Sequence, residues 1–221
     1  MKNQVYNPFL PLNEYIPDGE PHVFGDRVYL YGSHDQAGSD RFCVQDYTVW
    51  SAPVDDLSDW HCHGVTYQKD QDARAVPGRL PDFYAPDCVR GNDGRYYLYY
   101  VAMGSNVQPF GPMSVAVGDT PAGPFAYLGD IRNPDGTPLA RFLTNDPAVI
   151  NDNGTIRLYY GWSINRDLRS RLLSPVYNLV QSKLFGRPVA EISQTKPSIN
   201  GCAYVELEND MLTVKGEPKL V

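Results

Sequence analysis

The chain has 221 residues and a formal net charge of −7 at neutral pH, with 19 Lys and Arg against 26 Asp and Glu. This acidic balance argues against a nucleic-acid-binding surface, which needs clustered positive charge, and no apolar run approaches the roughly 18 residues that span a bilayer. A hydrophobic share of 42% is too high for a disordered chain, so we expect one globular domain, or a piece of a larger all-β one, without nucleic-acid or membrane partners.

The N-terminus and the cysteines indicate a cytoplasmic protein. The first residues carry one Lys and lack the apolar segment of a secretory signal. A chain of this length can build a core without disulfides, so we expect reduced thiols at the four scattered cysteines, Cys43, Cys62, Cys88 and Cys202. The run His61–His63 contains residue types of a metal site, but no second ligand pair follows at zinc-like spacing, and a plain strand edge is favoured.

Three aromatic runs with strand-forming residues recur along the chain. These runs are Val28–Gly32, Tyr96–Tyr100 and Ile156–Gly161. Each follows a turn signal that supplies the positive φ of a tight hairpin: Gly25-Asp26, Asn92-Asp93-Gly94 and Asp152-Asn153-Gly154. An aspartate precedes each turn glycine by seven or eight residues: Asp18, Asp87 and Asp146. The repeated unit is therefore an Asp, a short strand, a glycine turn and an aromatic strand.

Each unit continues with a strand, a polar turn and a second strand. These second halves are Val49–Trp60, Ser114–Phe125 and Ala203–Val214. Two hairpins per unit make a four-stranded antiparallel sheet, and such sheets repeated at a period above about 40 residues are typical of a β-propeller. We expect blades at about residues 15–65, 83–130 and 143–216. The third contains an insertion at about 166–200, where the partly helical pattern of Arg166–Leu184 is interrupted by Pro175.

The three unit-leading aspartates suggest chemistry in the channel. Equivalent positions in successive blades converge at one end of a propeller channel, so Asp18, Asp87 and Asp146 would surround one pocket. Like charges held close raise at least one pKa, and paired carboxylates flanking a sugar bond perform glycoside hydrolysis. Aspartate also starts ordinary turns, and the pattern alone leaves these two interpretations about equally open.

Several motifs resemble glycoside hydrolase family 43. They are Asn7–Pro11 with Ile16–Phe24, Tyr84–Asp87 with Gly94–Tyr100, and Asn145–Val149. The resemblance follows the family's blade order over almost the whole chain and is weakest in the insertion. It implies an all-β, five-bladed β-propeller, of which this chain supplies about the first three blades. It also implies cleavage of glycosidic bonds with inversion, as in β-xylosidases, α-L-arabinofuranosidases and arabinanases.

The resemblance also implies roles for single residues. Asp18 matches the general base, Asp146 matches the Asp that tunes the acid's pKa and orients the sugar, and Asp87 matches a position that lines the sugar pocket. The family's general acid is a Glu of the fourth blade, beyond Val221. The late glutamates of this chain do not match its motif: Glu191, Glu206, Glu208 and Glu217.

Four further residues are candidates for sugar binding. Tyr84 or Phe83 and Trp162 could form an apolar wall, and His34 could reach the channel. The alternatives are packing between blades for the aromatic residues and a satisfied turn for His34. The resemblance implies no required cofactor, and a channel cation such as calcium is expected only in the complete propeller.

The expected function is hydrolysis of xylo- or arabino-oligosaccharides. Two alternatives stay open: a non-catalytic carbohydrate-binding propeller or inactive truncated fragment, and a related propeller that acts on other furanosides or galactosides. Three blades also leave open sheet edges, which favour self-association.

Overall fold

The computed structural model describes residues 7–103, 112–139, 144–161, 174–185, 188–194 and 202–221. Within these ranges the chain forms three antiparallel sheets, each of four strands. The first contains β1 (Glu20–Phe24), β2 (Arg27–Tyr31), β3 (Tyr47–Pro53) and β4 (His61–Tyr67). The second contains β5 (Asp82–Arg90), β6 (Tyr96–Met103), β7 (Met113–Gly118) and β8 (Ala126–Asp130). The third contains β9 (Ala148–Asp152), β10 (Thr155–Tyr160), β11 (Ala203–Glu206) and β12 (Lys219–Leu220).

The hairpin turns form where the sequence predicts them. Gly25 joins β1 to β2 with a φ of 66°, and Asn153 and Gly154 join β9 to β10 with φ values of 50° and 92°. A positive φ at the first central residue, as at Gly25, or at both central residues, as at Asn153 and Gly154, matches the right-handed twist of the flanking strands. Each of these turns therefore fixes the register of a first and a second strand.

Two cores hold the three sheets together. Between the first and second sheets lies an aromatic cluster, in which the rings of Tyr67 and Phe83 stack with centroids 5.2 Å apart and those of Phe83 and Tyr100 lie 4.8 Å apart. Between the second and third sheets lies a mainly aliphatic cluster that includes Val101, Val115 and Leu158. The middle sheet is thus buried on both faces.

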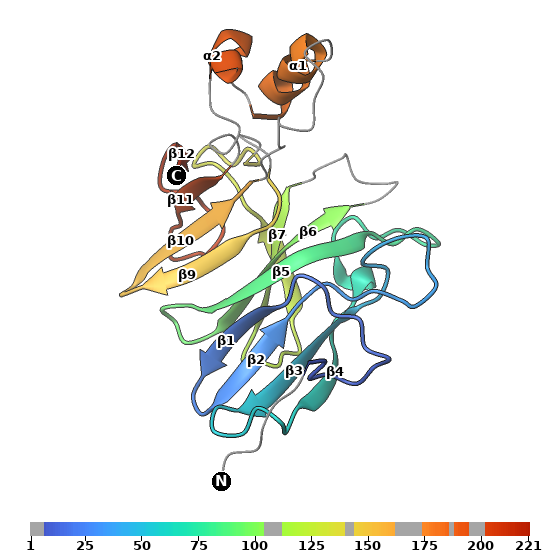
Figure 1. Cartoon of the computed structure of the whole chain (residues 1–221). Coiled ribbons are helices and arrows are strands. Elements are labelled where there is room, and N and C mark those ends of the chain that lie inside the picture. The colour runs from blue at the N-terminus through green and yellow to red at the C-terminus, as the bar shows by residue number, and fades with distance from the viewer. Residues whose placement is uncertain (1–6, 104–111, 140–143, 162–173, 186–187, 195–201) are drawn as a thin grey trace.

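The first strand of each sheet lies toward the common centre. Figure 1 shows β1, β5 and β9 side by side, with the other strands of each sheet extending outward. Strand β5 lies between the other two and contacts both of them. Residues on these three strands, and in the turns just before them, are therefore the ones that can meet.

The insertion contains two helices, α1 (Ser174–Phe185) and α2 (Val189–Gln194), which project beyond the third sheet in Figure 1. Pro175 lies in the first turn of α1, and the part of the Arg166–Leu184 pattern before residue 174 lies outside the described residues. Proline is favoured in a first turn, since the N–H that it lacks has no partner within the helix. Neither helix of the described residues has the length and apolar character needed to cross a membrane.

The last strand of the third sheet also differs from expectation. The segment before Val214 forms a tight turn, in which Asp210 accepts hydrogen bonds from the backbone N–H groups of Leu212 and Thr213, at 3.0 and 2.8 Å. Met211, Leu212 and Val214 are buried in the core between the second and third sheets. The fourth strand, β12, comes five residues later and pairs with β11.

Candidate functional site

Two aspartates occupy the same place in the first and third sheets. Asp18 and Asp146 each lie two residues before the innermost strand of their sheet. Both have left-handed backbone conformations, with φ values of 54° and 47°, which Asp tolerates better than most residues do. Both are accessible to solvent. Unusual backbone conformations of this kind cluster at functional sites.

The two carboxylates lie close enough to influence each other. Partial burial of the Asp146 carboxyl group raises its pKa, and the negative charge of Asp18 raises it further. A neighbouring like charge disfavours ionisation, so this coupling reports proximity between the first and third sheets. The convergence of these two residues, which are 128 positions apart, is what the sequence analysis expected of them.

Asp87 does not occupy the equivalent position in the second sheet. The register of β5 against β6 shifts between Tyr84 and Asp87, which marks a β-bulge. Ala85, inside this bulge, has the left-handed φ of 37°. It lies two residues before the regular part of β5, as Asp18 and Asp146 lie two residues before β1 and β9. The predicted equivalence of the three aspartates is therefore wrong for Asp87, and the matching residue is Ala85.

The Asp87 carboxylate instead makes contacts with all three sheets. It is 3% exposed. Its Oδ1 lies 2.5 Å from His22 Nε2 on β1 and accepts a hydrogen bond from the Cys88 N–H at 2.7 Å. Its Oδ2 accepts a hydrogen bond from the Val149 N–H on β9 at 2.6 Å. Both oxygens of Asp87 are thus engaged by protein groups.

Ser33 supports Asp18 from the end of β2. Its hydroxyl is fully buried and accepts a hydrogen bond from the Ala85 N–H at 2.8 Å. The hydroxyl proton can therefore be donated to Asp18 Oδ2, which lies 3.4 Å away. Sequence reasoning did not select Ser33, because its partner Ala85 is 52 residues distant and no local pattern connects the two.

The segment before Asp18 lies directly against the end of β2. Ser33 N–H donates to the Pro17 carbonyl at 3.0 Å. Gly32 makes this approach possible, because a Cβ at that position would lie 2.5 Å from Ile16 Cγ2 and 2.8 Å from the Pro17 oxygen. The absence of a side chain at Gly32 therefore helps to set the path of the backbone into Asp18.

The other sequence candidates have different surroundings. Phe83 is fully buried in the aromatic core, which agrees with the packing alternative. Tyr84 is partly buried and packs against the second core. His34 is 9% exposed, and its Nδ1 lies 2.8 Å from the Asp46 carbonyl oxygen, as a satisfied turn requires. Trp162 lies outside the described residues.

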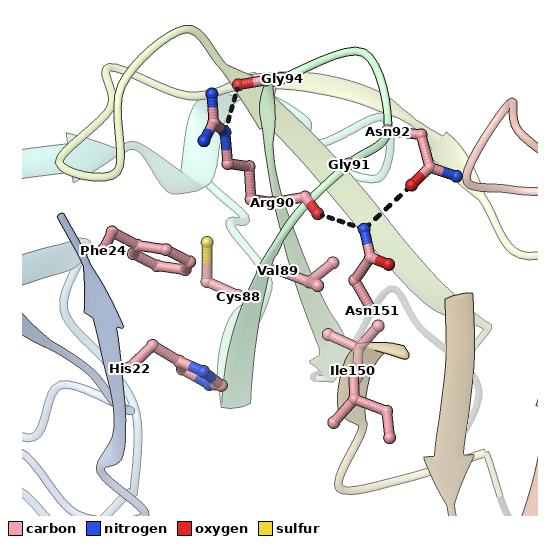
Figure 2. Close-up of a pocket in the computed structure, with 11 residues that line it drawn as sticks. His22, Phe24, Cys88, Val89, Arg90, Gly91, Asn92, Gly94, Ile150 and Asn151 are labelled. Carbon is pink, nitrogen blue, oxygen red and sulfur yellow. Dashed lines mark hydrogen bonds between the residues drawn. The ribbon is translucent and has the colours of Figure 1, made fainter. Parts of the chain in front are cut away.

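A cavity of about 540 Å³ lies between the three innermost strands. Figure 2 shows His22 and Phe24 of β1 facing Cys88 of β5, with Ile150 of β9 on the other side. At its edge, Asn151 Nδ2 donates hydrogen bonds to the Arg90 carbonyl at 3.1 Å and to Asn92 Oδ1 at 3.0 Å. The lining residues lie farther along the strands than Asp18 and Asp146, so this cavity and the carboxylate pair are separate features.

The described residues hold no group of three or more His, Cys, Asp or Glu side chains that could bind a metal ion. In the run His61–His63, the Nε2 atom of His63 lies 2.7 Å from Ser51 Oγ. That contact joins neighbouring strands of the first sheet, as a strand edge would. The expected channel cation stays a prediction for the complete propeller.

Comparison with known sequences decides the family. Residues 6–221 match the family described as glycosyl hydrolases family 43. The chain belongs to glycoside hydrolase family 43. A xylosidase/arabinosidase of Thermoclostridium stercorarium is 48% identical over 166 residues, or 73% of this chain. Xylosidase/arabinosidase 43A of Humicola insolens is 32% identical over 158 residues, or 67% of this chain.

Solved family 43 structures have the same fold. A β-xylosidase/α-arabinofuranosidase from a compost metagenome, in complex with xylotriose, has a TM-score of 0.65 and 25% identity and covers the whole chain. A Xanthomonas citri family 43 enzyme with bound xylotriose has a TM-score of 0.63 and 26% identity over 97% of the chain. The fold class is therefore confirmed: the three sheets are blades of a β-propeller.

The chain covers only part of each relative. It spans 34% and 44% of the two curated relatives and 62% and 57% of the two solved structures. The last two shares are close to the three fifths that three of five blades would occupy.

Proposed function

We propose that this family 43 chain provides the water-activating part of an inverting glycosidase site for xylo- or arabino-oligosaccharides. The observation that carries the proposal is the Asp18–Asp146 pair, with two solvent-accessible carboxylates from different blades coupled through their charges. The substrate class is supported by relatives named xylosidase/arabinosidase and by similar structures with bound xylotriose.

In the proposed reaction Asp18 accepts a proton from the water that attacks the anomeric carbon. The hydroxyl of Ser33 is placed to steady one Asp18 oxygen, while the other stays available to the water. Asp146 orients the sugar and tunes the pKa of the acid. In an inverting site the acid and the base stand about 6.5–9.5 Å apart, which leaves room for the water.

The acid that protonates the leaving oxygen is assigned to a Glu outside residues 1–221. Glu206 is on β11, where its carboxylate lies 3.5 Å from the guanidinium of Arg157. Glu208 and Glu217 are exposed residues after β11. None of these positions is on an innermost strand. Hydrolysis in this proposal therefore needs the general acid in addition to Asp18 and Asp146. Sugar binding does not need that acid.

The experiment compares two proteins with aryl xyloside and aryl arabinofuranoside substrates: residues 1–221 alone, and the reading frame that encodes them taken to its stop codon. We expect hydrolysis by the second protein, with inverted anomeric configuration in the first product seen by NMR. Asp18→Asn should lower kcat by about 10²–10⁴-fold, the usual contribution of a general base. The exposed turn residue Asp26 provides the matched control, Asp26→Asn, which should retain activity.

Undiminished turnover in Asp18→Asn would refute the base assignment, and a product of retained configuration would refute inversion. If neither protein hydrolyses these substrates but calorimetry detects xylotriose binding, the carbohydrate-binding alternative is correct.

A further inference from the structure

We infer that Asp87 and His22 form a link across the three blades that sets the separation of the Asp18 and Asp146 carboxylates. Asp87 is thereby a positioning residue and not a sugar ligand. This inference rests on the proposed function only for the chemical roles of Asp18 and Asp146, because the link itself can be measured without any catalysis.

The link lies close in sequence to both carboxylates. His22 follows Asp18 by four residues on β1, and Val149 follows Asp146 by three residues on β9. Asp87 on β5 contacts both, through His22 Nε2 at 2.5 Å and the Val149 N–H at 2.6 Å. Each strand residue advances the chain by only about 3.3 Å, so the link lies close to both carboxylates along the chain. A shift of β1 at the link would therefore be transmitted to Asp18, and a shift of β9 to Asp146.

Other directional contacts between the sheets each join two of them. The Ala85 N–H donates to Ser33 Oγ between the first and second sheets, and Asn151 donates to Asn92 Oδ1 between the second and third. The two cores rest mainly on the hydrophobic effect, which is non-directional, so they resist separation more than they resist small sliding movements. Asp87 makes directional bonds within its own strand and to both neighbouring blades.

Charge strengthens the link. Burial lowers the pKa of His22, but the hydrogen bond to Asp87 and its negative charge raise this pKa by more, so the pKa lies above its ordinary value. Nearby Glu20 adds a smaller increase. A bond between an imidazolium and a carboxylate is stronger than a neutral one. Because Asp87 is almost fully buried, loss of its partner would leave a poorly solvated charge.

The pKa of the Asp146 carboxyl group reports the separation. It is raised by partial burial and by the charge of Asp18. If the link loosens, the two carboxylates move apart and water enters, and both changes lower the pKa of Asp146 toward its ordinary value. This pKa can be measured on residues 1–221 by NMR titration of ¹³C-labelled Asp carboxyl groups, with Asp146→Asn assigning the signal.

Three variants provide the test. His22→Phe keeps a ring and removes the donor, and we expect it to lower the pKa of Asp146, in the same direction as Asp18→Asn. His22→Gln keeps an N–H donor in nearly the same place and should preserve the wild-type value. His63 lies on β4, the outermost strand of the first blade, and contacts Ser51 on β3. His63→Phe removes this comparable contact and should leave the Asp146 pKa unchanged.

Hydrogen exchange and a double variant separate positioning from stability. Loss of the link should speed hydrogen exchange of the Val149 amide. Asp87→Asn should shift the pKa of Asp146 by the same amount as His22→Phe, and the double variant should show no further shift. If Val149 exchanges faster in His22→Phe while the Asp146 pKa stays at its wild-type value, the link is merely structural and the inference is wrong. Additive shifts would also overturn it. Should His22→Phe fold poorly, the near-isosteric Asp87→Asn gives the same readout. Because no sugar is present, these outcomes are independent of the glycosidase assay.

Discussion

Replacement of Gly32 by alanine should disturb the candidate site without touching either carboxylate. The new Cβ would lie 2.5 Å from Ile16 Cγ2 and 2.8 Å from the Pro17 oxygen, whereas ordinary contact begins at 3.4 Å. Ile16 and Pro17 would therefore have to move by about 0.6–0.9 Å relative to the end of β2. The hydrogen bond from Ser33 N–H to the Pro17 carbonyl, 3.0 Å in length, would be lost or strained by this movement.

The expected cost has a stability part and an activity part. Overpacking of a tight contact costs about 1–3 kcal/mol of unfolding free energy, which urea unfolding of residues 1–221 can measure. Asp18, the proposed general base, follows Pro17 directly, and displacement of a catalytic group by about 1 Å costs about 10²-fold in rate. We therefore expect a drop of that order in kcat/KM, measured on the protein from the complete reading frame.

Gly216→Ala is the matched control for Gly32→Ala. A Cβ at Gly216 would have no atom within 4 Å, and its backbone needs no positive φ, so both stability and kcat/KM should stay close to wild type. If Gly32→Ala is destabilised as expected yet keeps wild-type kcat/KM, the path of Ile16 and Pro17 does not control the position of Asp18, and the reasoning fails.

Two further predictions concern stability. Asp146→Asn should raise the unfolding free energy of residues 1–221 at pH 7. Folding raises the pKa of the Asp146 carboxyl group, so the folded protein loses stability as the pH rises and this group ionises. Asn has no charge and removes that loss. The gain should disappear below about pH 4, where the carboxyl group is protonated in both states, and a gain that persists there would contradict this explanation. Phe83→Ala should cost about 3–5 kcal/mol in urea unfolding, since it empties a fully buried site. For comparison, Phe42→Ala at a 69% exposed site should cost under about 0.5 kcal/mol, and equal losses would mean that the Phe83 ring does not fill the aromatic core.

The sequence predicted the sheets well because their signals are local. A turn such as Asn153-Gly154 needs positive φ at adjacent positions, and few residue types tolerate it. The aromatic runs that follow such turns became the second strands β2, β6 and β10. The family motifs then identified Asp18 and Asp146, whose proximity comes from repetition of one blade geometry.

The role of Asp87 could not be predicted in the same way. The bulge at Ala85 depends on how β5 pairs with β6, since Asp87 lies opposite Tyr99 while Tyr84 lies opposite Val101. Counting back from the turn glycine cannot detect an extra residue in the strand. The partners of Asp87, His22 and Val149, are also 65 and 62 residues away, so no spacing rule connects them.

The prediction of a strand ending at Val214 in the third blade failed for a related reason. Val214 has the apolar character of a strand end, but the side chain of Asp210 satisfies the nearby backbone N–H groups and favours a compact turn. Burial of Met211 and Leu212 against the neighbouring blade then decides between turn and strand. That competition depends on tertiary contacts.

A left-handed residue lies two positions before the regular part of each innermost strand, and this has a wider consequence. Asp18 and Asp146 have this conformation, and so does Ala85, which has no carboxylate. The blade thus maintains the same backbone shape whether or not the side chain can take part in catalysis. The backbone conformation at this position comes from the blade architecture, and its side chain can be Asp or Ala. A propeller of this kind can gain or lose an acidic group at this position by one substitution, without rebuilding a sheet.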